Sequence, residues 1–480
     1  MTLLLLLLAC DGSTTKDSDA VTEETGTDST DGTDDTQPSD DTQSPDDTAP
    51  TDDTSVTTET GETGPVDTAI PECGPEFTEG EPLLLGPWMT WNDVATPADG
   101  VVVSFQAKGD AYVCYGATEA LGLRAEGYVD KTQHHVSLTD LPAGATTWYR
   151  VVIDGVATRP YSITTAPAEP APYKFLVAAD MQDLGNPEHR WNEIATTMVE
   201  QHGDAAFLLA PGDLVCDDNP ECWHDFFASG DPLFSAIPII PAVGNHETPT
   251  LASSPDHSTF LHYFDLPDAS GDEALYSIRW GNTLLLTADS DVRTDMMPGT
   301  RQYDWIAGAL DEAWNGGPSY DWIFASWHFP PYNVGVRQAH HQWEVRTMTE
   351  LFDNRLDWHF SGHEHLYQRY VPMLHSGLAA SSGEYGLSKD QGVGYMVMPA
   401  AGGTTQPNLV DADTREGDML PLVAYPPIEE GQTVTPSEHG FVVVEIDGRT
   451  ITITSWALGN DNLPREPYIL DQISYTKPTL

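Results

Sequence analysis

Short runs in which apolar and polar residues alternate follow one another along residues 74–167. Turn residues separate these runs at intervals of about 8–12 positions, which is typical of proteins built from short strands. The runs are residues 100–108, 111–117, 134–141, 147–155 and 161–167. We therefore expect an all-β sandwich domain over residues 73–168, and nothing in these runs carries chemistry.

From about residue 172 the pattern changes, and strand-like apolar runs alternate with amphipathic helical segments. Predicted strands cover residues 173–180, 204–213, 237–247, 321–328 and 356–365, and residues 274–280 and 282–290 predict a hairpin. Predicted helices cover residues 192–202, 301–314, 346–355 and the stretch around 225–234. This alternation indicates a layered α/β domain, which we place at residues 169–475.

The first 72 residues have a composition unlike either domain. Residues 11–72 are almost entirely Thr, Asp, Ser, Gly, Glu and Pro, so they predict a disordered acidic linker. Residues 1–10 form an apolar run that ends in Leu-Ala-Cys and is too short to span a bilayer. This run resembles the lipobox of bacterial lipoproteins, with Cys10 as the lipidated residue, and a plain secretory signal is the alternative. We expect an exported protein, either a bacterial cell-envelope lipoprotein or a secreted one.

The charge of the chain narrows its choice of partners. It has 20 basic and 75 acidic residues, a net charge of −55. Lys and Arg are too sparse to neutralise a nucleic-acid backbone, so we expect no nucleic-acid partner. An anionic membrane surface is disfavoured for the same reason, so we expect contact with a membrane only through a lipid anchor at Cys10.

Four cysteines remain besides Cys10, and an even number in an exported protein predicts disulfides. Cys216 and Cys222 are close enough in sequence to close a small loop. Cys73 would then pair with Cys114, although the sequence alone leaves the connectivity open.

Five segments of the α/β region place a metal-ligand side chain just after a strand-like run. A two-metal site that cleaves phosphate esters needs oxygen and nitrogen ligands and a carboxylate that bridges the ions. Each such residue alone is more often a cap, a turn or a packing residue, so the ordered combination carries the prediction. In chain order the segments contain Asp180, Asp213, Asn245 with His246, His328, and His363 with His365.

These motifs resemble the calcineurin-like metallophosphoesterase superfamily, and most of all the purple acid phosphatases. That branch joins an N-terminal fibronectin-like domain to a catalytic domain with the pattern D, GDxxY, GNH(E), VxxH, GHxH. The resemblance covers about residues 74–470. It implies a four-layer α/β/β/α sandwich, preceded by an all-β sandwich of fibronectin or immunoglobulin type. The implied activity is that of a metal-dependent phosphoric ester hydrolase acting on small phosphate monoesters.

The resemblance also implies a role for each matching position. It makes His246 and Asp213 the catalytic residues, with His246 orienting the phosphate and protonating the leaving oxygen while a metal-bound hydroxide attacks phosphorus. The implied cofactors are two di- or trivalent metal ions, iron with zinc, manganese or a second iron, and no organic cofactor. The implied metal ligands are Asp180 and His365 for the first ion, Asn245, His328 and His363 for the second, and Asp213 as the bridge.

Two positions depart from the family pattern. Cys216 stands where GDxxY has its metal-binding tyrosine, and we favour a disulfide with Cys222 over a thiolate ligand. We therefore expect no tyrosinate colour. Gln182 stands where other branches have the His of D-x-H, and it is a weak ligand, a hydrogen-bond partner of the ligands, or neither. His340 and His341 follow in a loop expected to reach the site and are candidate substrate contacts.

Two other functions stay open. A phosphodiesterase or nucleotidase of the same superfamily would carry the same motifs, because the shape of the cleft is invisible in the sequence. A catalytically weakened surface-binding protein, with a mainly structural metal site, would account for the missing tyrosine. The retention of His246 and of all second-metal ligands favours the phosphatase.

Overall fold

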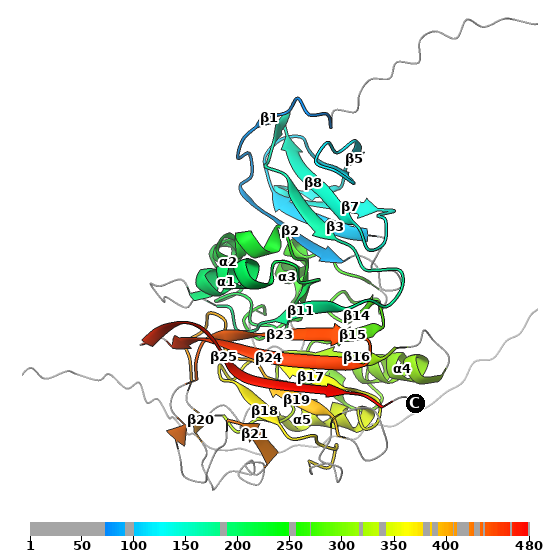
Figure 1. Ribbon diagram of the computed structural model, residues 1–480, viewed down its shortest axis with the longest axis vertical. Coiled ribbons are helices and arrows are strands. Elements are labelled where there is room, and N and C mark those ends of the chain that lie inside the picture. The colour runs from blue at the N-terminus through cyan, green and yellow to red at the C-terminus, as the bar shows by residue number, and fades with distance from the viewer. Residues whose placement is uncertain are drawn as a thin grey trace, which may run out of the picture. The chain divides into compact units, whose positions relative to one another are not determined.

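The computed structural model describes residues 73–91, 100–182, 190–248, 256–268, 270–315, 320–335, 342–377, 385, 392–406, 408–409, 422–426, 433–434, 437–460 and 463–478. These residues belong to one compact unit, whose elements are labelled in Figure 1. Among them, no helix combines the length and the apolar character needed to cross a membrane. The predicted leader and linker (1–72) lie outside this part of the chain.

The N-terminal region, residues 73–164, consists of strands in two sheets. One sheet has the order β1-β9-β8-β4-β5, with β10 paired to β8, and strands β2, β3, β7 and β6 belong to a second, larger sheet. Val103 of the larger sheet and Val151 of the other belong to the same buried hydrophobic cluster. The region is therefore all-β, and its fibronectin or immunoglobulin type stays a prediction. The bounds are β1 Thr78–Glu79, β2 Leu85–Trp91, β3 Gly100–Gln106, β4 Ala111–Gly116, β5 Leu123–Ala125, β6 Tyr128–Asp130, β7 Gln133–Thr139, β8 Thr146–Ile153, β9 Val156–Ala157 and β10 Tyr161–Thr164.

The larger sheet has ten strands and runs from the C-terminal strands into the N-terminal region. Its order is β25-β24-β23-β11-β12-β13-β2-β3-β7-β6. Strands β11, β12 and β13 are parallel, whereas β23 joins β11 in the antiparallel sense. The strands not yet bounded are β11 Tyr173–Val177, β12 Leu208–Ala210, β13 Ile239–Pro241, β23 Gly440–Asp447, β24 Thr450–Asn460 and β25 Leu463–Thr476.

A second sheet of seven strands has the order β14-β15-β16-β17-β19-β18-β21. The predicted hairpin is present as the antiparallel pair β14 and β15, and β15, β16, β17 and β19 run parallel. The remaining strands, β20 and β22, form a small pair of their own. The bounds are β14 Tyr276–Trp280, β15 Thr283–Thr287, β16 Trp322–Ser326, β17 Trp358–Ser361, β18 Gln368–Tyr370, β19 Gly394–Val397, β20 Asn408–Leu409, β21 Val423–Tyr425 and β22 Thr433–Val434.

Aromatic side chains fill the space between the ten-stranded and the seven-stranded sheets. Phe175 of β11 lies 5.7 Å, ring centre to ring centre, from Phe324 of β16, which lies 5.9 Å from Phe360 of β17. Side chains alternate along a strand, so Ile323 and Ala325 point the other way, into a separate cluster with Ile306 and Leu310 of helix α4 (Arg301–Asn315). Apolar side chains therefore pack against both faces of the second sheet, as expected for parallel strands.

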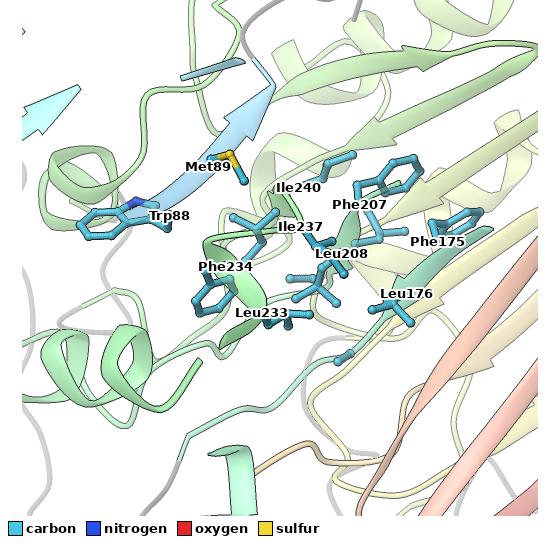
Figure 2. Close-up of a cluster of buried hydrophobic side chains, with 14 of the residues drawn as sticks. Trp88, Met89, Phe175, Leu176, Phe207, Leu208, Leu233, Phe234, Ile237 and Ile240 are labelled. Atoms are coloured by element: carbon cyan, nitrogen blue, oxygen red, sulfur yellow. The ribbon is translucent and has the colours of Figure 1, made fainter. Parts of the chain in front are cut away.

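Helices α1 and α2 cover the other face of the ten-stranded sheet. Near the end of α1, His202 packs edge-on against Phe441 of β23 and Trp456 of β24. Figure 2 shows Leu176 and Leu208 grouped with Leu233 and Phe234 of α2. Helices, two sheets and helices thus follow one another, which confirms the predicted α/β fold. The helices are α1 Arg190–His202, α2 Pro220–Phe234, α3 Ser258–Tyr263, α4 Arg301–Asn315 and α5 Gln342–Thr347, with 3₁₀ turns at Arg293–Met296 and Met348–Leu351.

The N-terminal region is joined to the α/β region by pairing and by packing. Strand β2 pairs with β13, with Thr90 opposite Ile239. The ring of Trp88 stacks on Phe227 with 3.9 Å between centroids, and its Nε1 donates to the Tyr263 carbonyl at 2.9 Å. Figure 2 shows Trp88 and Met89 on β2, beside the cluster that contains Leu233 and Phe234 of α2. The predicted boundary at 168–169 therefore separates two regions that share one sheet.

One predicted helix differs from the structure. The pattern predicts a helix over 346–355, but α5 ends at Thr347 and a 3₁₀ turn follows to Leu351. Asn354 has a φ of 62°, a left-handed conformation that a continuing α-helix does not accommodate. Thr347 and Thr349 also donate their hydroxyls to backbone carbonyls, which competes with regular helix formation.

Candidate metal centre

The predicted metal ligands all follow strands that end at the same edge of the two sheets. Asp180 and Asp213 come after β11 and β12, and Asn245 follows β13. The histidines follow the parallel strands β16 and β17 of the second sheet. A hydrogen bond links the two groups of loops, since the backbone N–H of His363 donates to the Asp180 side chain at Oδ1 over 2.9 Å. The fold therefore brings all six predicted ligands together where α/β sheets bind their ligands.

Four of the six predicted ligands have left-handed backbone, with φ of 54° at Asp180, 52° at Asp213, 73° at His363 and 50° at His365. Such a conformation costs roughly 1–2 kcal/mol for a residue other than glycine. Residues held in this way by their surroundings concentrate at functional sites. All four positions lie in the loops that follow strands β11, β12 and β17.

Among the described residues, Asp213, His328 and His363 form one of two buried clusters with metal-ligand spacing, and their ligand atoms lie within 4.8 Å of one another. His328 Nε2 lies 3.1 Å from Asp213 Oδ2 and 3.3 Å from His363 Nδ1. Asn245 Oδ1 lies 3.2 Å from His328 Nε2 and 3.0 Å from His363 Nδ1. His328 Nδ1 faces the Pro211 carbonyl at 3.0 Å, which fixes that nitrogen as the donor and leaves Nε2 for a metal.

The second cluster contains Asp180, Asp213 and His365. His365 Nε2 lies 3.4 Å from Asp180 Oδ1, and its Nδ1 faces the Thr404 carbonyl at 2.8 Å. A Cβ on Gly403 would lie 2.6 Å from His365 Cε1, so the turn that positions this imidazole requires glycine. Asp213 belongs to both clusters, which is the arrangement that its predicted bridging role requires.

The electrostatics show how strongly these groups interact. Burial alone would raise the pKa of the Asp213 carboxyl, but His328, His246 and His363 hold it well below its usual range. Conversely, burial alone would lower the pKa of His328, and the Asp213 carboxylate raises it to about 9. The cluster thus binds positive charge strongly at its centre, and hard oxygen and nitrogen donors around a shared carboxylate suit divalent ions.

Glu247 holds the Asp213 loop in place, a function that the sequence did not reveal. Its buried carboxylate accepts backbone N–H bonds from Asp213 at 2.9 Å, Leu214 at 2.7 Å, Val215 at 3.1 Å and Gly244 at 2.7 Å. Burial and the charge of Asp213 raise the pKa of Glu247 to about 7. Its place directly after Gly-Asn-His was the signal that could have found it.

Gly244 allows the two loops to touch. A Cβ at this position would lie 2.2 Å from the Asp213 backbone nitrogen and 2.4 Å from its Oδ1. No side chain can be accommodated at that distance, so glycine is needed where the Asn245 loop crosses the Asp213 loop.

His246 lies at the rim of the two clusters. Its Nδ1 faces the Cys216 carbonyl at 2.7 Å, and its Nε2 lies 3.8 Å from Asp213 Oδ2. The side chain is 25% exposed, whereas that of Asp213 is fully buried. Burial alone would lower the pKa of His246, but Asp213 raises it. The other two predicted substrate contacts, His340 and His341, lie outside the described residues.

Comparison with known proteins decides the family. Residues 173–367 match the family model of the calcineurin-like phosphoesterases. This segment is a calcineurin-like phosphoesterase domain. The predicted superfamily and its likeness to purple acid phosphatases are confirmed.

Two curated plant proteins give the extent of the phosphoesterase similarity. The chain is 29% identical to purple acid phosphatase 22 of Arabidopsis thaliana over 253 residues, 49% of this chain and 53% of that protein. It is 25% identical to purple acid phosphatase 18 of the same plant over 309 residues, 63% of this chain and 67% of that protein. The alignments thus span between about half and two thirds of these relatives.

Two solved structures share the fold of this chain. A purple acid phosphatase from seeds of yellow lupin, Lupinus luteus, superimposes with a TM-score of 0.63 at 16% identity, covering 82% of this chain and 74% of the lupin protein. The structure of PhoD superimposes with a TM-score of 0.58 at 11% identity, covering 83% of this chain and 92% of PhoD.

The chain departs from the purple acid phosphatase pattern where the sequence indicated. Cys216 forms a disulfide with Cys222, so its sulfur is not available as a thiolate ligand. The predicted Cys73–Cys114 disulfide is also present. Gln182 lies within hydrogen-bond distance of both Asp213 and His365.

Proposed function

We propose that this chain is an exported phosphatase that holds two metal ions and hydrolyses small phosphate monoesters. The observation that carries the proposal is the pair of buried ligand clusters that share Asp213. One carboxylate common to two sets of oxygen and nitrogen donors is what a dinuclear hydrolytic centre requires. The family match supports the same reaction class.

The donor atoms fit a pair of metal ions. His328 and His365 each have one ring nitrogen fixed by a backbone carbonyl, and the other nitrogen faces carboxylate oxygens. The first ion would be held by Asp180, Asp213 and His365, and the second by Asp213, Asn245, His328 and His363. Bound there, the ions would activate water for attack on phosphorus and neutralise charge on the phosphoryl oxygens.

His246 is the general acid in this proposal. Its Nδ1 is held by the Cys216 carbonyl, so the opposite nitrogen, Nε2, is left to meet the leaving-group oxygen. In the metal-free chain, burial alone would lower the pKa of His246, and the neighbouring Asp213 carboxylate raises it. A positioned acid of this kind contributes roughly 10²–10⁴-fold to such a reaction.

The two disulfides support export, because such bonds form and persist in oxidising compartments. In this proposal the acidic linker separates the folded part from the cell surface, and Cys10 carries a lipid. Radiolabelled palmitate on the wild-type chain but not on Cys10→Ser would identify the lipoprotein. A cleaved, unlabelled protein in the medium would identify a secreted one.

The test of the activity uses the purified chain, stripped of metal and then reloaded. Hydrolysis of p-nitrophenyl phosphate should return with metal and exceed that of bis-p-nitrophenyl phosphate, whereas the reverse preference would identify a phosphodiesterase. His246→Ala should lower kcat about 100-fold or more without loss of metal. His224→Ala is the matched control, since His224 is exposed on α2. A loaded protein that hydrolysed neither ester, with His246→Ala indistinguishable from it, would contradict the proposal.

A further inference from the structure

The side-chain amide of Gln182 lies inside the cluster formed by Asp180, Asp213 and His365. Gln182 is 1% exposed. Its Nε2 lies 3.3 Å from Asp213 Oδ2 and 3.3 Å from His365 Nε2. One terminal atom of this amide therefore points at the two atoms that would bind the first metal ion.

The other terminal atom of the amide, Oε1, is buried and has no hydrogen-bond partner among the residues that the structure describes. A buried amide oxygen without a partner destabilises the folded state, because the water it loses on burial is not replaced. In this orientation the amide turns its donor toward lone pairs and leaves its acceptor unused. Rotation of the amide by half a turn would place the oxygen beside Asp213 Oδ2 and His365 Nε2, which is favourable only with a cation between them.

The spacing fits such a cation. Ligands at about 2.1 Å from an ion in tetrahedral coordination lie about 3.4 Å from one another. The Gln182 atom that now faces the cluster, Nε2, lies 3.3 Å from Asp213 Oδ2 and 3.3 Å from His365 Nε2. His365 Nε2 lies 3.4 Å from Asp180 Oδ1. The amide thus occupies a ligand position in the cluster.

We infer that Gln182 Oε1 is the fourth protein ligand of the first metal ion and that this site takes a divalent cation. Gln182 is uncharged, and the Cys216 sulfur is held in a disulfide with Cys222. The ligand set therefore contains two carboxylates, one imidazole and one amide. A ligand set that consists mostly of oxygen donors and has an uncharged fourth ligand suits Mn²⁺, Zn²⁺ or Fe²⁺. The inference rests on the proposed function, because it presupposes a metal in the cluster.

A positioning role is the competing explanation. Gln182 also lines a cavity of about 20 Å³ together with the disulfide, which is room for one water molecule. A water there would bind Oε1 and leave Nε2 as a donor to Asp213. The two roles predict opposite orders of metal affinity for two variants of Gln182. Gln182→Glu supplies a charged oxygen ligand, but without the N–H donor its carboxylate repels that of Asp213. Gln182→Leu supplies neither a ligand nor a donor.

The experiment titrates Mn²⁺ into the metal-free full chain by calorimetry and follows free Mn²⁺ by electron paramagnetic resonance. Asp180→Asn serves as the one-site reference. We expect Gln182→Leu to weaken binding at one site about 10-fold or more and to superimpose on the Asp180→Asn titration. Gln182→Glu should bind both ions at least as tightly as the wild type. The melting temperature of the metal-free Gln182→Leu protein should match that of the metal-free wild type. Added Mn²⁺ should raise the melting temperature of the variant by less than that of the wild type.

The inference is overturned if Gln182→Leu binds both ions with wild-type affinity, or if Gln182→Glu is the weaker of the two variants. A lower melting temperature of metal-free Gln182→Leu would also overturn it, because that places the residue in packing. These results leave the proposed function intact. A wild-type chain that binds no ion and hydrolyses no ester contradicts both proposals.

Discussion

The two halves of the metal centre share Asp213 but are built from different side chains. The half around His328 and His363 uses two imidazoles and the Asn245 amide, so Asp213 is its one negative ligand among the described residues. The half around Asp180 and His365 has two carboxylates. Since Coulomb attraction grows with ligand charge, the half around Asp180 and His365 should hold its ion more firmly. The shared carboxylate links the occupancy of both.

The largest effect is expected from Asp213→Asn, which removes the ligand common to both halves. The neutral amide cannot bridge two ions, and three histidines lose the charge that faces them. Metal analysis should show both ions lost, and hydrolysis should fall to background. Retention of one ion at wild-type affinity would show that the halves do not depend on the shared carboxylate.

Single-site variants should separate the two halves. His328→Gln removes a ligand of one half and His365→Gln a ligand of the other, so each should lose one ion, with affinity at that site lowered more than about 100-fold. Calorimetric titration checks this. Of the two residual sites, the one left in His328→Gln contains both carboxylates and should be the tighter. The reverse order would break the comparison between the halves.

A smaller effect on both halves is expected from Glu247→Gln. The amide keeps the size of the side chain but loses half of its accepting capacity and its charge, so the four backbone N–H bonds weaken. Affinity for both ions should fall about 10- to 100-fold. The exposed Glu445 offers a control, and Glu445→Gln should leave both affinities unchanged.

The smallest effect on metal binding is expected from the double variant Cys216→Ser, Cys222→Ser. Because the disulfide closes a short loop, its removal should lower the free energy of unfolding by about 2–3 kcal/mol, measured by urea unfolding. The Cys216 carbonyl that holds His246 would be less well fixed, so kcat should fall while both ions stay bound. Cys73→Ser with Cys114→Ser is the comparison, because it should cost stability but leave kcat unchanged. Loss of an ion from the first double variant would instead make this loop part of the metal site.

Much of the site could be predicted from the sequence because its ligands follow strands in a fixed order. Asp180, Asp213 and His363 stand directly after apolar runs, and each run became a strand whose carboxyl end faces the centre. The Cys216–Cys222 disulfide was likewise predictable, since a short separation in sequence limits the possible partners. The role of Glu247 was not, because its place after Gly-Asn-His indicates only that it lies near the site, whereas three of the four backbone groups that it binds lie in the Asp213 loop.

The fold could be predicted in kind but not in its connections. Alternating strands and helices indicated the α/β region, and short alternating strands indicated the all-β region before it. The pairing of β2 with β13 merges these regions in one sheet, and such pairing depends on residues about 150 positions apart, which hydrophobic periodicity does not relate. The 346–355 helix was overestimated because periodicity does not register the left-handed Asn354.

The sequence by itself determined which side chains are available for metal chemistry and, through their order after apolar runs, which end of the sheets they occupy. Only the tertiary structure decided which ligands share an ion, that Asp213 stands between both clusters, and that the Gln182 amide lies among the ligands of one of them. The reason is physical. Local patterns set the direction of a side chain relative to its own strand, whereas distances between ligands are set by the packing of two sheets against each other.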